Sequence, residues 1–225
     1  MIKIDKTQSL VTLINAHVCQ RGKQQELADL LVEAVNSIYK NAEGFISAAI
    51  HASEDGTRVT NYAQYSSREA VEGMWKANPN IPAFAKKVGA IADSFDPHLH
   101  EIAEIGAGGA AEDSSAQAVT IDPQKSFVTL IDIYSCKPQD QQKLADTLSE
   151  AVKTVYAELP GFVSAVVHKS FDKKSVVNYA QWQSRVHFEA AREDESLAAL
   201  RRKTEKLSES FDGDHIYKVA EAIEA

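Results

Sequence analysis

The chain is built from two copies of one unit, and this repeat limits its possible folds more than any other feature. Residues 9–71 align without a gap on residues 126–188. After a divergent stretch, the copies agree again at the Ser-Phe-Asp sequences that begin at Ser94 and Ser210. A unit of roughly 100 residues is a domain rather than a solenoid repeat, which spans about 20–50 residues. The sequence therefore predicts two similar domains in tandem.

The boundaries of the units follow from this alignment and from local composition. We place the first unit at residues 1–105 and the second at residues 125–225. Residues 106–124 between them are rich in Gly, Ala, Ser and acidic residues, which is typical of an exposed linker. Cys19 and Cys136 occupy equivalent positions in the copies. We expect both to be small, half-buried residues near a strand end, with a disulfide between the copies as the alternative.

Charge and hydropathy exclude several kinds of partner. The formal net charge of -8 argues against binding to a nucleic-acid backbone or an anionic membrane. No apolar run approaches the roughly 18 residues that a membrane span needs. The first eight residues alternate charged and apolar side chains, unlike a secretory signal. We therefore expect a cytoplasmic protein.

Each unit shows the same order of predicted elements. In the first unit these are a strand at 9–18, a helix at 23–40, strands at 45–53 and 57–65, helices at 67–77 and 81–94, and a strand at 98–105. The dipeptide Asp55-Gly56 is a strong hairpin signal between the two middle strands. This order is the ferredoxin-like βαββαβ arrangement, an α+β fold whose sheet has helices on one face only. We expect the second unit to cover the other face, which makes the chain an internal pseudo-dimer.

A five-residue stretch marks the candidate pocket, because it occurs in both units: Asn61 to Tyr65, and Asn178 to Trp182. Side chains alternate along a strand, so the Asn and the aromatic residue share a face about 13 Å apart, within reach of one planar molecule. On the preceding strand, alternation gives Phe45, Ser47, Ala49 and His51 a common face. If the hairpin sets His51 opposite Asn61, the histidine joins the pocket, whereas a one-residue slip sends it to the other face.

Each of these residues also has a purely structural explanation. A Trp on a sheet face usually belongs to a packed core. Asn is depleted in strands and its amide needs partners when buried, but its recurrence also fits a shared structural role. His51 and His168 fit half-exposed strand ends as well as functional sites. The sequence shows no nucleophile triad, phosphate loop, CxxC, HExxH or metal-ligand spacing. The chemistry that remains is hydrogen bonding, proton transfer or activation of a reactive substrate.

The motifs resemble those of the antibiotic biosynthesis monooxygenase family. The second unit carries the resemblance in Gly161-Phe162-Val163-Ser164-Ala165, His168-Lys169-Ser170 and Val177-Asn178-Tyr179-Ala180-Gln181-Trp182, and the first in the matching sequences that begin at Gly44, His51 and Asn61. The resemblance implies a dimeric α+β barrel, normally formed by two chains but here by the two units of one chain. Characterised relatives oxidise polycyclic phenols such as anthrones to quinones, using O2 without metal, flavin or haem.

In those relatives, an Asn and a Trp on the third strand bind and polarise the substrate, while a Tyr and an Arg assist. The resemblance assigns catalytic roles to Asn178, Trp182 and Arg201. It assigns substrate contacts to further residues of both units: His168, Phe188, Asn61, Tyr65 and His51. Phe188 stands where the family has Tyr and cannot transfer a proton. The first unit has Tyr65 for the Trp, Val71 for the Tyr and Lys86 nearest to the Arg.

These features favour a cofactor-independent monooxygenase that oxidises an aromatic, polyketide-like or quinol molecule with O2. The alternative is a non-catalytic small-molecule-binding or stress-response protein that keeps the fold and the pocket. A third reading is a haem-degrading monooxygenase, although the histidines offer no obvious axial ligand. We expect a small aromatic molecule as partner and no metal, and further association of chains into a homo-oligomer is possible in principle. If only one unit is active, we expect it to be the second.

Overall fold

The computed structural model describes residues 1–111 and 118–225. The first half of the chain contains β1 (Ile2–Asp5), β2 (Val11–Cys19), α1 (Gln24–Ala34), β3 (Phe45–Ser53), β4 (Arg58–Tyr65), α2 (Arg68–Ala77), α3 (Ile81–Gly89) and β5 (Ala92–Ala107). The second half contains β6 (Ala118–Ile121), β7 (Val128–Ser135), α4 (Gln141–Thr154), β8 (Phe162–Ser170), β9 (Ser175–Trp182), α5 (Arg185–Arg192), α6 (Glu195–Glu205), β10 (Ser210–Asp212) and β11 (Ile216–Glu224).

The main sheet closes into a barrel. Among the described residues its strand order is β10-β7-β11-β3-β4-β2-β5-β8-β9, and β9 also pairs with β7. That last pairing joins the two ends, so that only β10 remains outside the ring. Closure removes the unpaired strand edges that an isolated ferredoxin-like sheet would expose.

The two units exchange their final strands. β5 of the first unit pairs with β8 of the second, and β11 of the second pairs with β3 of the first. The predicted pseudo-dimer within one chain is therefore confirmed, as a pseudo-dimeric α+β barrel. Because each unit completes the other's sheet, neither half has all its backbone hydrogen bonds without its neighbour.

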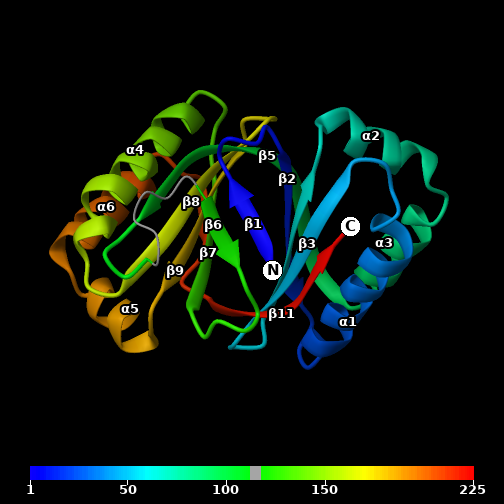
Figure 1. Ribbon diagram of the computed structural model, residues 1–225, viewed down its shortest axis with the longest axis horizontal. Helices are drawn as coiled ribbons and strands as arrows, with labels where there is room; N and C mark the ends of the chain where they lie inside the picture. Colours follow the sequence, from blue (N-terminus) through cyan, green and yellow to red (C-terminus); the bar gives the residue numbers. More distant parts are fainter. Residues whose placement is uncertain (112–117) are drawn as a thin grey trace.

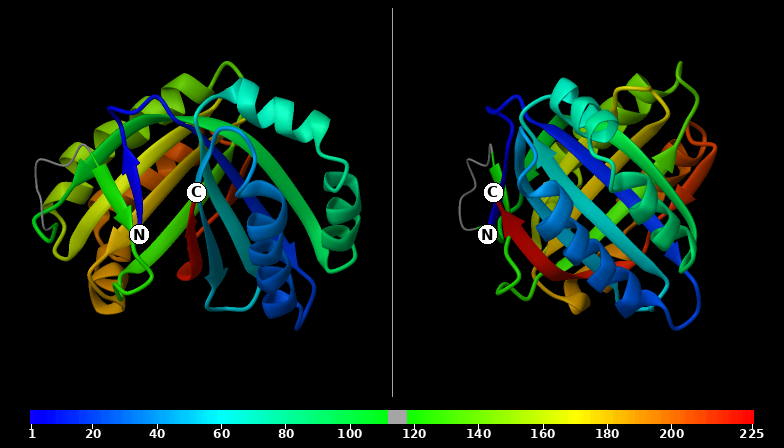
Figure 2. Two further views of the ribbon diagram at one scale, coloured as in Figure 1. Left: turned by 45° about the vertical axis from the view of Figure 1, so that its right-hand side comes forward. Right: turned by 90° about the vertical axis from the view of Figure 1, so that its right-hand side faces the viewer.

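Helices cover the barrel on opposite sides, with α1, α2 and α3 on one side and α4, α5 and α6 on the other (Figures 1 and 2). The apolar stripe predicted for the first long helix is buried at Leu27 and Leu31, and its equivalent in α4 at Leu144 and Leu148. These stripes pack on the outer faces of the strands as two separate cores. A third core fills the inside of the barrel, with Tyr62, Tyr179 and Tyr217 as its largest members.

Two predicted helices end earlier than expected. The helix predicted at 23–40 ends as α1 at Ala34 and continues as a π-helical turn at Val35–Tyr39. The helix predicted at 81–94 ends at Gly89, and β5 begins at Ala92. The reason is tertiary, because Ala92 and Ser94 pair with Cys19 and Val18 at the end of β2. Strand pairing across the sheet overrides the local helical pattern there.

Part of the predicted linker is a strand. Residues 118–121 form β6, which pairs antiparallel with β1, while residues 112–117 lie outside the described residues. Ile2, Ile4, Val119 and Ile121 are buried and belong to the core inside the barrel. In Figure 1 this two-stranded ribbon lies between the two helical layers. Its alternating apolar side chains cover the barrel interior, which is why this part of residues 106–124 is not exposed.

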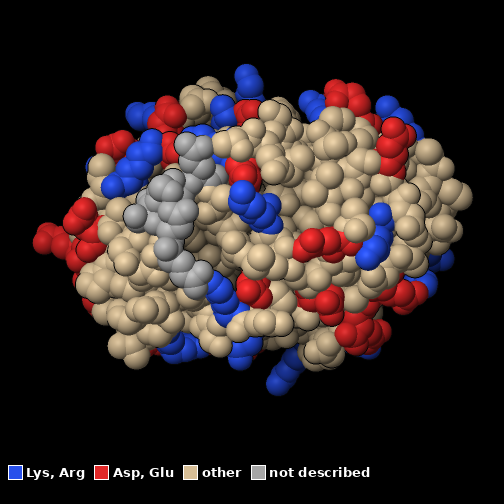
Figure 3. All heavy atoms as spheres, viewed as in Figure 1, with Lys and Arg blue, Asp and Glu red and all other residues tan. Residues whose placement is uncertain are grey.

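The cysteines, the helices and the surface charges can be compared with what the sequence led us to expect. Cys19 and Cys136 are free and buried, so the alternative of a disulfide between the copies is not realised. Within the part of the chain that the structure describes, no helix is long and apolar enough to cross a membrane. On the face seen in Figure 3, acidic and basic side chains are mixed rather than gathered by sign.

Candidate functional site

Asn178 and Trp182 lie on the face of β9 that points toward the helices. Trp182 belongs to the core between helices and strands, whereas the intervening Tyr179 belongs to the core inside the barrel. The strand alternation expected from the sequence is therefore present. Alternate residues of β9 face either the helices or the inside of the barrel. The site of the second unit lies outside the barrel, between β7, β9 and the helices α5 and α6.

A small cavity of about 40 Å³ opens between these elements. Its wall combines aromatic, aliphatic and charged side chains: Leu130, Asp132, Tyr134, Tyr156, Trp182, Phe188, Arg192, Leu197, Leu200, Arg201, Thr204, Phe211 and Asp214. Asn178 does not line the open space, but it is the β9 residue directly opposite Asp132. Of the residues predicted for this site, the structure thus brings Trp182, Phe188 and Arg201 together, with Asn178 beside them.

Aromatic rings fix the position of the indole. Trp182 is only 1% exposed and meets Phe162 edge to face, with ring centroids 5.3 Å apart. Tyr156 and Phe188 contact the same indole at centroid distances of 6.1 and 6.2 Å. Such a set of rings holds the indole in one orientation and offers flat, apolar surface to a planar ligand.

Two polar groups of the Asn–Trp pair are buried without a hydrogen bond among the described residues. They are Nε1 of Trp182 and Oδ1 of Asn178. The Asn178 amide lies close enough to the Asp132 carboxyl to lower its pKa by hydrogen bonding. A buried donor or acceptor without a partner costs about 1–3 kcal/mol, so a bound polar molecule or an ordered water would stabilise these groups.

Asp132 is the site residue that the sequence did not reveal. It lies opposite Asn178 on β7 and is 8% exposed. Burial raises the pKa of its carboxyl to about 6, an effect that the nearby charge of Asp214 adds to and the Arg201 guanidinium opposes. Its Oδ1 accepts a hydrogen bond of 3.1 Å from the backbone N–H of Asp214. The available signal was an acidic residue inside an otherwise apolar strand.

A glycine lets the following loop approach this carboxylate. A Cβ placed on Gly213 would lie 2.6 Å from Oδ1 of Asp132 and 2.2 Å from the Phe211 ring. Any side chain there would therefore push the loop away and weaken the hydrogen bond from Asp214. The close packing that buries Asp132 thus depends on a residue outside the strand.

Arginines stand at the rim of the cavity rather than at its floor. Nη2 of Arg201 lies 3.2 Å from Oδ1 of Asp214, and Nη2 of Arg192 lies 3.6 Å from its Oδ2. The side chain of Arg201 is 44% exposed. The guanidinium predicted to assist catalysis is therefore engaged by a neighbouring carboxylate at the mouth.

His51 and His168 do not belong to the Asn–aromatic sites, contrary to the conditional expectation. His51 lies opposite Thr60 and not opposite Asn61, and His168 lies opposite Val177. This is the one-residue slip, and it turns both histidines into the barrel. There Nε2 of His168 lies 3.0 Å from the Tyr62 hydroxyl, and Nε2 of His51 lies 3.2 Å from that of Tyr179.

A β-bulge also changes the face of Phe45. The register shifts between Phe45 and Ser47, so that Phe45 pairs with Tyr65 on the helix side. Their rings meet edge to face at 5.7 Å. Ser47 and the residues that alternate with it instead face the barrel, so the common face expected for Phe45 and His51 does not exist.

The matching site of the first unit has a different composition. Asn61 lies opposite Asn15, and the Oδ1 atoms of both are buried without a partner in the described residues. Nδ2 of Asn15 donates to Nε2 of His17 at 3.3 Å, and Nδ1 of His17 donates to the Val59 carbonyl at 3.0 Å. Burial lowers the pKa of His17 to about 4, so the ring stays neutral. Because Asn15 replaces Asp132, this site lacks the buried carboxylate of the second.

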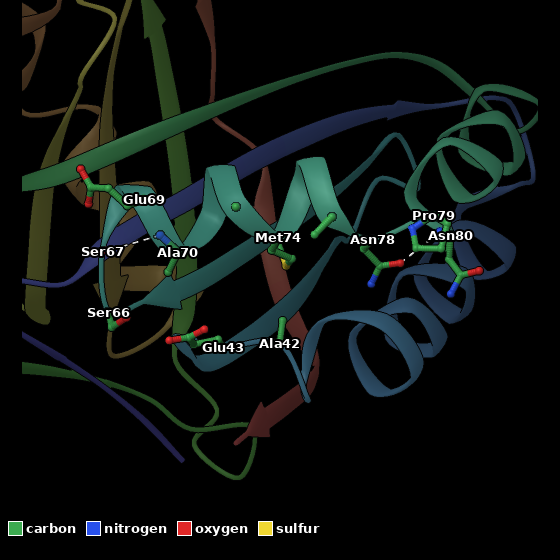
Figure 4. A pocket seen from close by; sticks show the side chains of 12 residues that line it. Ala42, Glu43, Ser66, Ser67, Glu69, Ala70, Met74, Asn78, Pro79 and Asn80 are labelled. Carbon is green, nitrogen blue, oxygen red and sulfur yellow. Dashed lines mark hydrogen bonds between the residues drawn. The ribbon is translucent and has the colours of Figure 1, made fainter.

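A larger groove of about 890 Å³ lies elsewhere on the first unit (Figure 4). It runs beside α2, past Ala42 and Glu43, and is open to solvent. Its hydrogen-bonding groups serve the helix ends: Ser67 Oγ accepts from the Ala70 N–H, and Asn78 Oδ1 from the Asn80 N–H. Size alone therefore does not make it the site, since no unpartnered buried polar atom is found among its described lining residues.

The fold defines a tandem α+β-barrel protein, with a small cavity between the strands and the helices of its second unit. The sequence model of the family described as antibiotic biosynthesis monooxygenase matches residues 11–87 and 127–203. The chain belongs to this family and carries its domain twice, which confirms the resemblance seen in the sequence.

Individual relatives agree with this assignment. The chain is 40% identical over 78 residues to the Tetracenomycin-F1 monooxygenase of Streptomyces glaucescens, a match that covers 35% of this chain and 70% of that protein. A solved anthrone oxidase-like protein is similar over 100% of this chain and 97% of its own, with a TM-score of 0.88 and 22% identity. A monooxygenase-like protein from Listeria innocua reaches a TM-score of 0.51 at 12% identity, over 96% of each chain. At these identities the two structures support the fold.

Proposed function

We propose that the second unit is the active site of a monooxygenase that oxidises an enolisable polycyclic phenol with O2, without a metal or an organic cofactor. One observation carries the proposal: a buried carboxylate, Asp132, stands beside unpartnered groups of Asn178 and Trp182 in a site walled by aromatic rings. Membership of the family and the similarity to Tetracenomycin-F1 monooxygenase support the same class of substrate.

Asp132 acts as the general base. It removes a proton from the acidic carbon of a ring CH2 group that is conjugated with a carbonyl through the fused aromatic rings. The electron pair left on carbon spreads onto the ring oxygen as an enolate. The amide N–H of Asn178 and the indole N–H of Trp182 donate to that oxygen and stabilise its negative charge.

Oxygen then reacts with the carbanion itself. The carbon forms a bond to O2, and the peroxide that results takes up a proton. Loss of the second proton from the same carbon and cleavage of the O–O bond leave a carbonyl and release water. One oxygen atom enters the product and the other leaves as water, so the carbon supplies all the electrons and no external reductant is needed.

In this proposal Asp132 takes over the proton transfer of the Tyr that the family has at the position of Phe188. Phe188 fills that position, with its ring tilted against that of Trp182 at a centroid distance of 6.2 Å, but it has no proton that it can transfer. The proton transfer passes in this chain to the opposite wall of the site, where the raised pKa of Asp132 suits a base that works near neutral pH.

The cavity must widen to admit such a substrate. About 40 Å³ holds a few water-sized molecules and not three fused rings. The movable wall is the pair α5–α6, which supplies Phe188, Leu197 and Leu200 to the lining. Arg192 and Arg201 bind Asp214 across the mouth, so these ion pairs hold the wall closed until substrate displaces it.

Oxygen uptake with anthrone tests the proposal. The Asn178→Ala variant should lose about 10²-fold in kcat, because a donor to the enolate is removed. The matched variant Asn61→Ala changes the equivalent residue of the first unit and should leave the rate unaltered. Binding of anthrones and hydroquinones without any oxygen uptake by the wild-type protein would instead identify a non-catalytic binding protein.

A further inference from the structure

The barrel has a cavity of its own, separate from the site on the helical side and larger than the cavity there. It has a volume of about 170 Å³ and lies between strands of both units at one end of the barrel. β2 contributes Ile14 and Ala16, β5 contributes His98 and His100, and β9 contributes Ser175 and Val177. Val177 and Asn178 are neighbours on β9, so the two sites lie on opposite faces of one wall.

Unpartnered polar groups face this cavity as well. His100 is 1% exposed, and neither Nδ1 nor Nε2 makes a hydrogen bond of good geometry among the described residues, although backbone groups of His98 and Thr12 lie near enough to raise its pKa slightly. Ser175 is 2% exposed and its Oγ is likewise without a partner. Burial lowers the pKa of His100 to about 3, with the nearby His168 and His98 acting in the same direction. The ring is therefore neutral and presents one N–H donor and one acceptor.

The charges around the cavity disfavour an ionic ligand. Asp96 and Asp212 are its acidic lining residues. Asp96 accepts from Nε2 of His98 at 3.0 Å, and Asp212 is paired with His215 and with Arg58. Among the described residues, the lining includes no Lys or Arg, and the nearby Arg58 is already paired with Asp212, so nothing there favours an anion.

We propose that this cavity binds a neutral monocyclic molecule with a hydroxyl group, of the size and chemistry of phenol. A cavity of about 150 Å³ lined by apolar residues is known to accept benzene, so the volume suits one ring. Ile14, Ala16 and Val177 contact the ring, while the hydroxyl binds His100. A ligand held by strands of both units stabilises the closed barrel by mass action.

Phenol titration with two separate readouts tests this site. The imidazole ¹⁵N signals of His100 report the barrel cavity, and the indole ¹⁵N signal of Trp182 reports the helical site. Phenol should shift the His100 signals and raise the Tm, while benzoate should do neither. In His100→Phe the affinity for phenol should fall about tenfold, as expected for a lost neutral hydrogen bond, while benzene binding is retained.

Variants in the barrel cavity and in the helical-side site show which of the two cavities binds phenol. Ala16→Leu fills the cavity and should abolish phenol binding, with Ala16→Val as the milder form if the first does not fold. Asn178→Ala should leave the His100 response intact, so failure of the proposed monooxygenase function would not affect this outcome. The proposal is overturned if phenol leaves the His100 signals unmoved, or if both Ala16 variants fold and bind phenol as the wild type does.

Discussion

One residue pair separates the two halves of this protein chemically. Asp132 and Asn15 occupy the same place in the repeat, opposite the equivalent residues Asn178 and Asn61. Burial raises the pKa of the Asp132 carboxyl to about 6, whereas an amide at that position neither takes up nor releases a proton. Both units keep the Asn, but only the second has a titratable carboxylate opposite it.

The base role proposed for Asp132 predicts both a rate and a pH profile. Asp132→Asn should lower the oxidation rate by about 10²- to 10⁴-fold, the usual contribution of general base catalysis. In the wild type, kcat/KM should rise as the pH increases through about 6, because the carboxylate must be ionised. Oxygen-uptake kinetics from pH 5 to 8 measure this. Asn15→Ala is the control, and an acid limb that persists in Asp132→Asn would assign the profile to another group.

At the scale of elements, His98 and His215 each form a hydrogen bond from the region of one unit's last strand to the hairpin turn of the other unit. Nδ1 of His98 lies 2.8 Å from Oδ2 of Asp172, and Nδ1 of His215 lies 2.6 Å from Oδ2 of Asp55. The other ring nitrogen of each binds a residue nearby in sequence, Asp96 or Asp212. Hydrogen bonds to Asp212 and Asp55 raise the pKa of His215, although partial burial opposes them.

The hydrogen bonds of His215 to Asp55 and Asp212 predict that the wild type and His215→Ala differ in stability by an amount that depends on pH. Because its pKa is raised on folding, its contribution is full below the unfolded value of about 6.5 and is lost as the pH rises through the folded pKa. His215→Ala should lower the free energy of unfolding by about 1 kcal/mol at pH 6, a value reduced for solvent exposure, and by less at pH 9. Urea denaturation measures it, with Arg68→Ala as a surface ion-pair control. An equal loss of unfolding free energy at both pH values would contradict a stabilising role for protonated His215.

At the scale of the whole molecule, paired side chains inside the barrel join the two units. Tyr62 binds His168 of the other unit, and Tyr179 binds His51, while the two tyrosine rings lie 5.7 Å apart. The exchanged strands β5 and β11 enclose this cluster. Because the same buried groups belong to both halves, we expect them to unfold in a single cooperative transition.

Buried neutral histidines predict a loss of stability in mild acid. Burial lowers the pKa of His17 and His51 to about 4, and that of His100 and His168 to about 3. Their contribution is therefore full above about pH 6.5 and is lost as the pH falls toward 4, by up to about 1.4 kcal/mol per pH unit for each histidine. Urea unfolding between pH 7.5 and 5 measures this slope.

A double variant is the matched test of that slope. His51→Gln with His168→Gln removes two of the four groups and should make the slope shallower, whatever its effect on stability at pH 7.5. His98→Gln changes the histidine that is bound to Asp172 and should leave the dependence of unfolding free energy on pH in place. An unchanged slope in the double variant would show that other groups govern the acid response.

The sequence by itself determined the features that depend on neighbours along the chain. The repeat predicted the internal pseudo-dimer, and the helical spacing of Leu27 and Leu31 predicted the buried stripe of α1. Strand alternation put Asn178 and Trp182 on one face, and their motifs identified the family. These are local patterns, readable because side-chain direction follows from position in a helix or strand.

The tertiary structure alone decided what each face meets. The turn between β3 and β4 placed His51 opposite Thr60 and so inside the barrel, and a bulge turned Phe45 outward. Pairing with β2 made a strand of residues that looked helical, and pairing with β1 did the same for part of the linker. Asp132 became a candidate base only because helices, a glycine loop and β9 together bury it. Register and burial depend on distant partners, and these set the chemistry of a side chain whose identity the sequence already states.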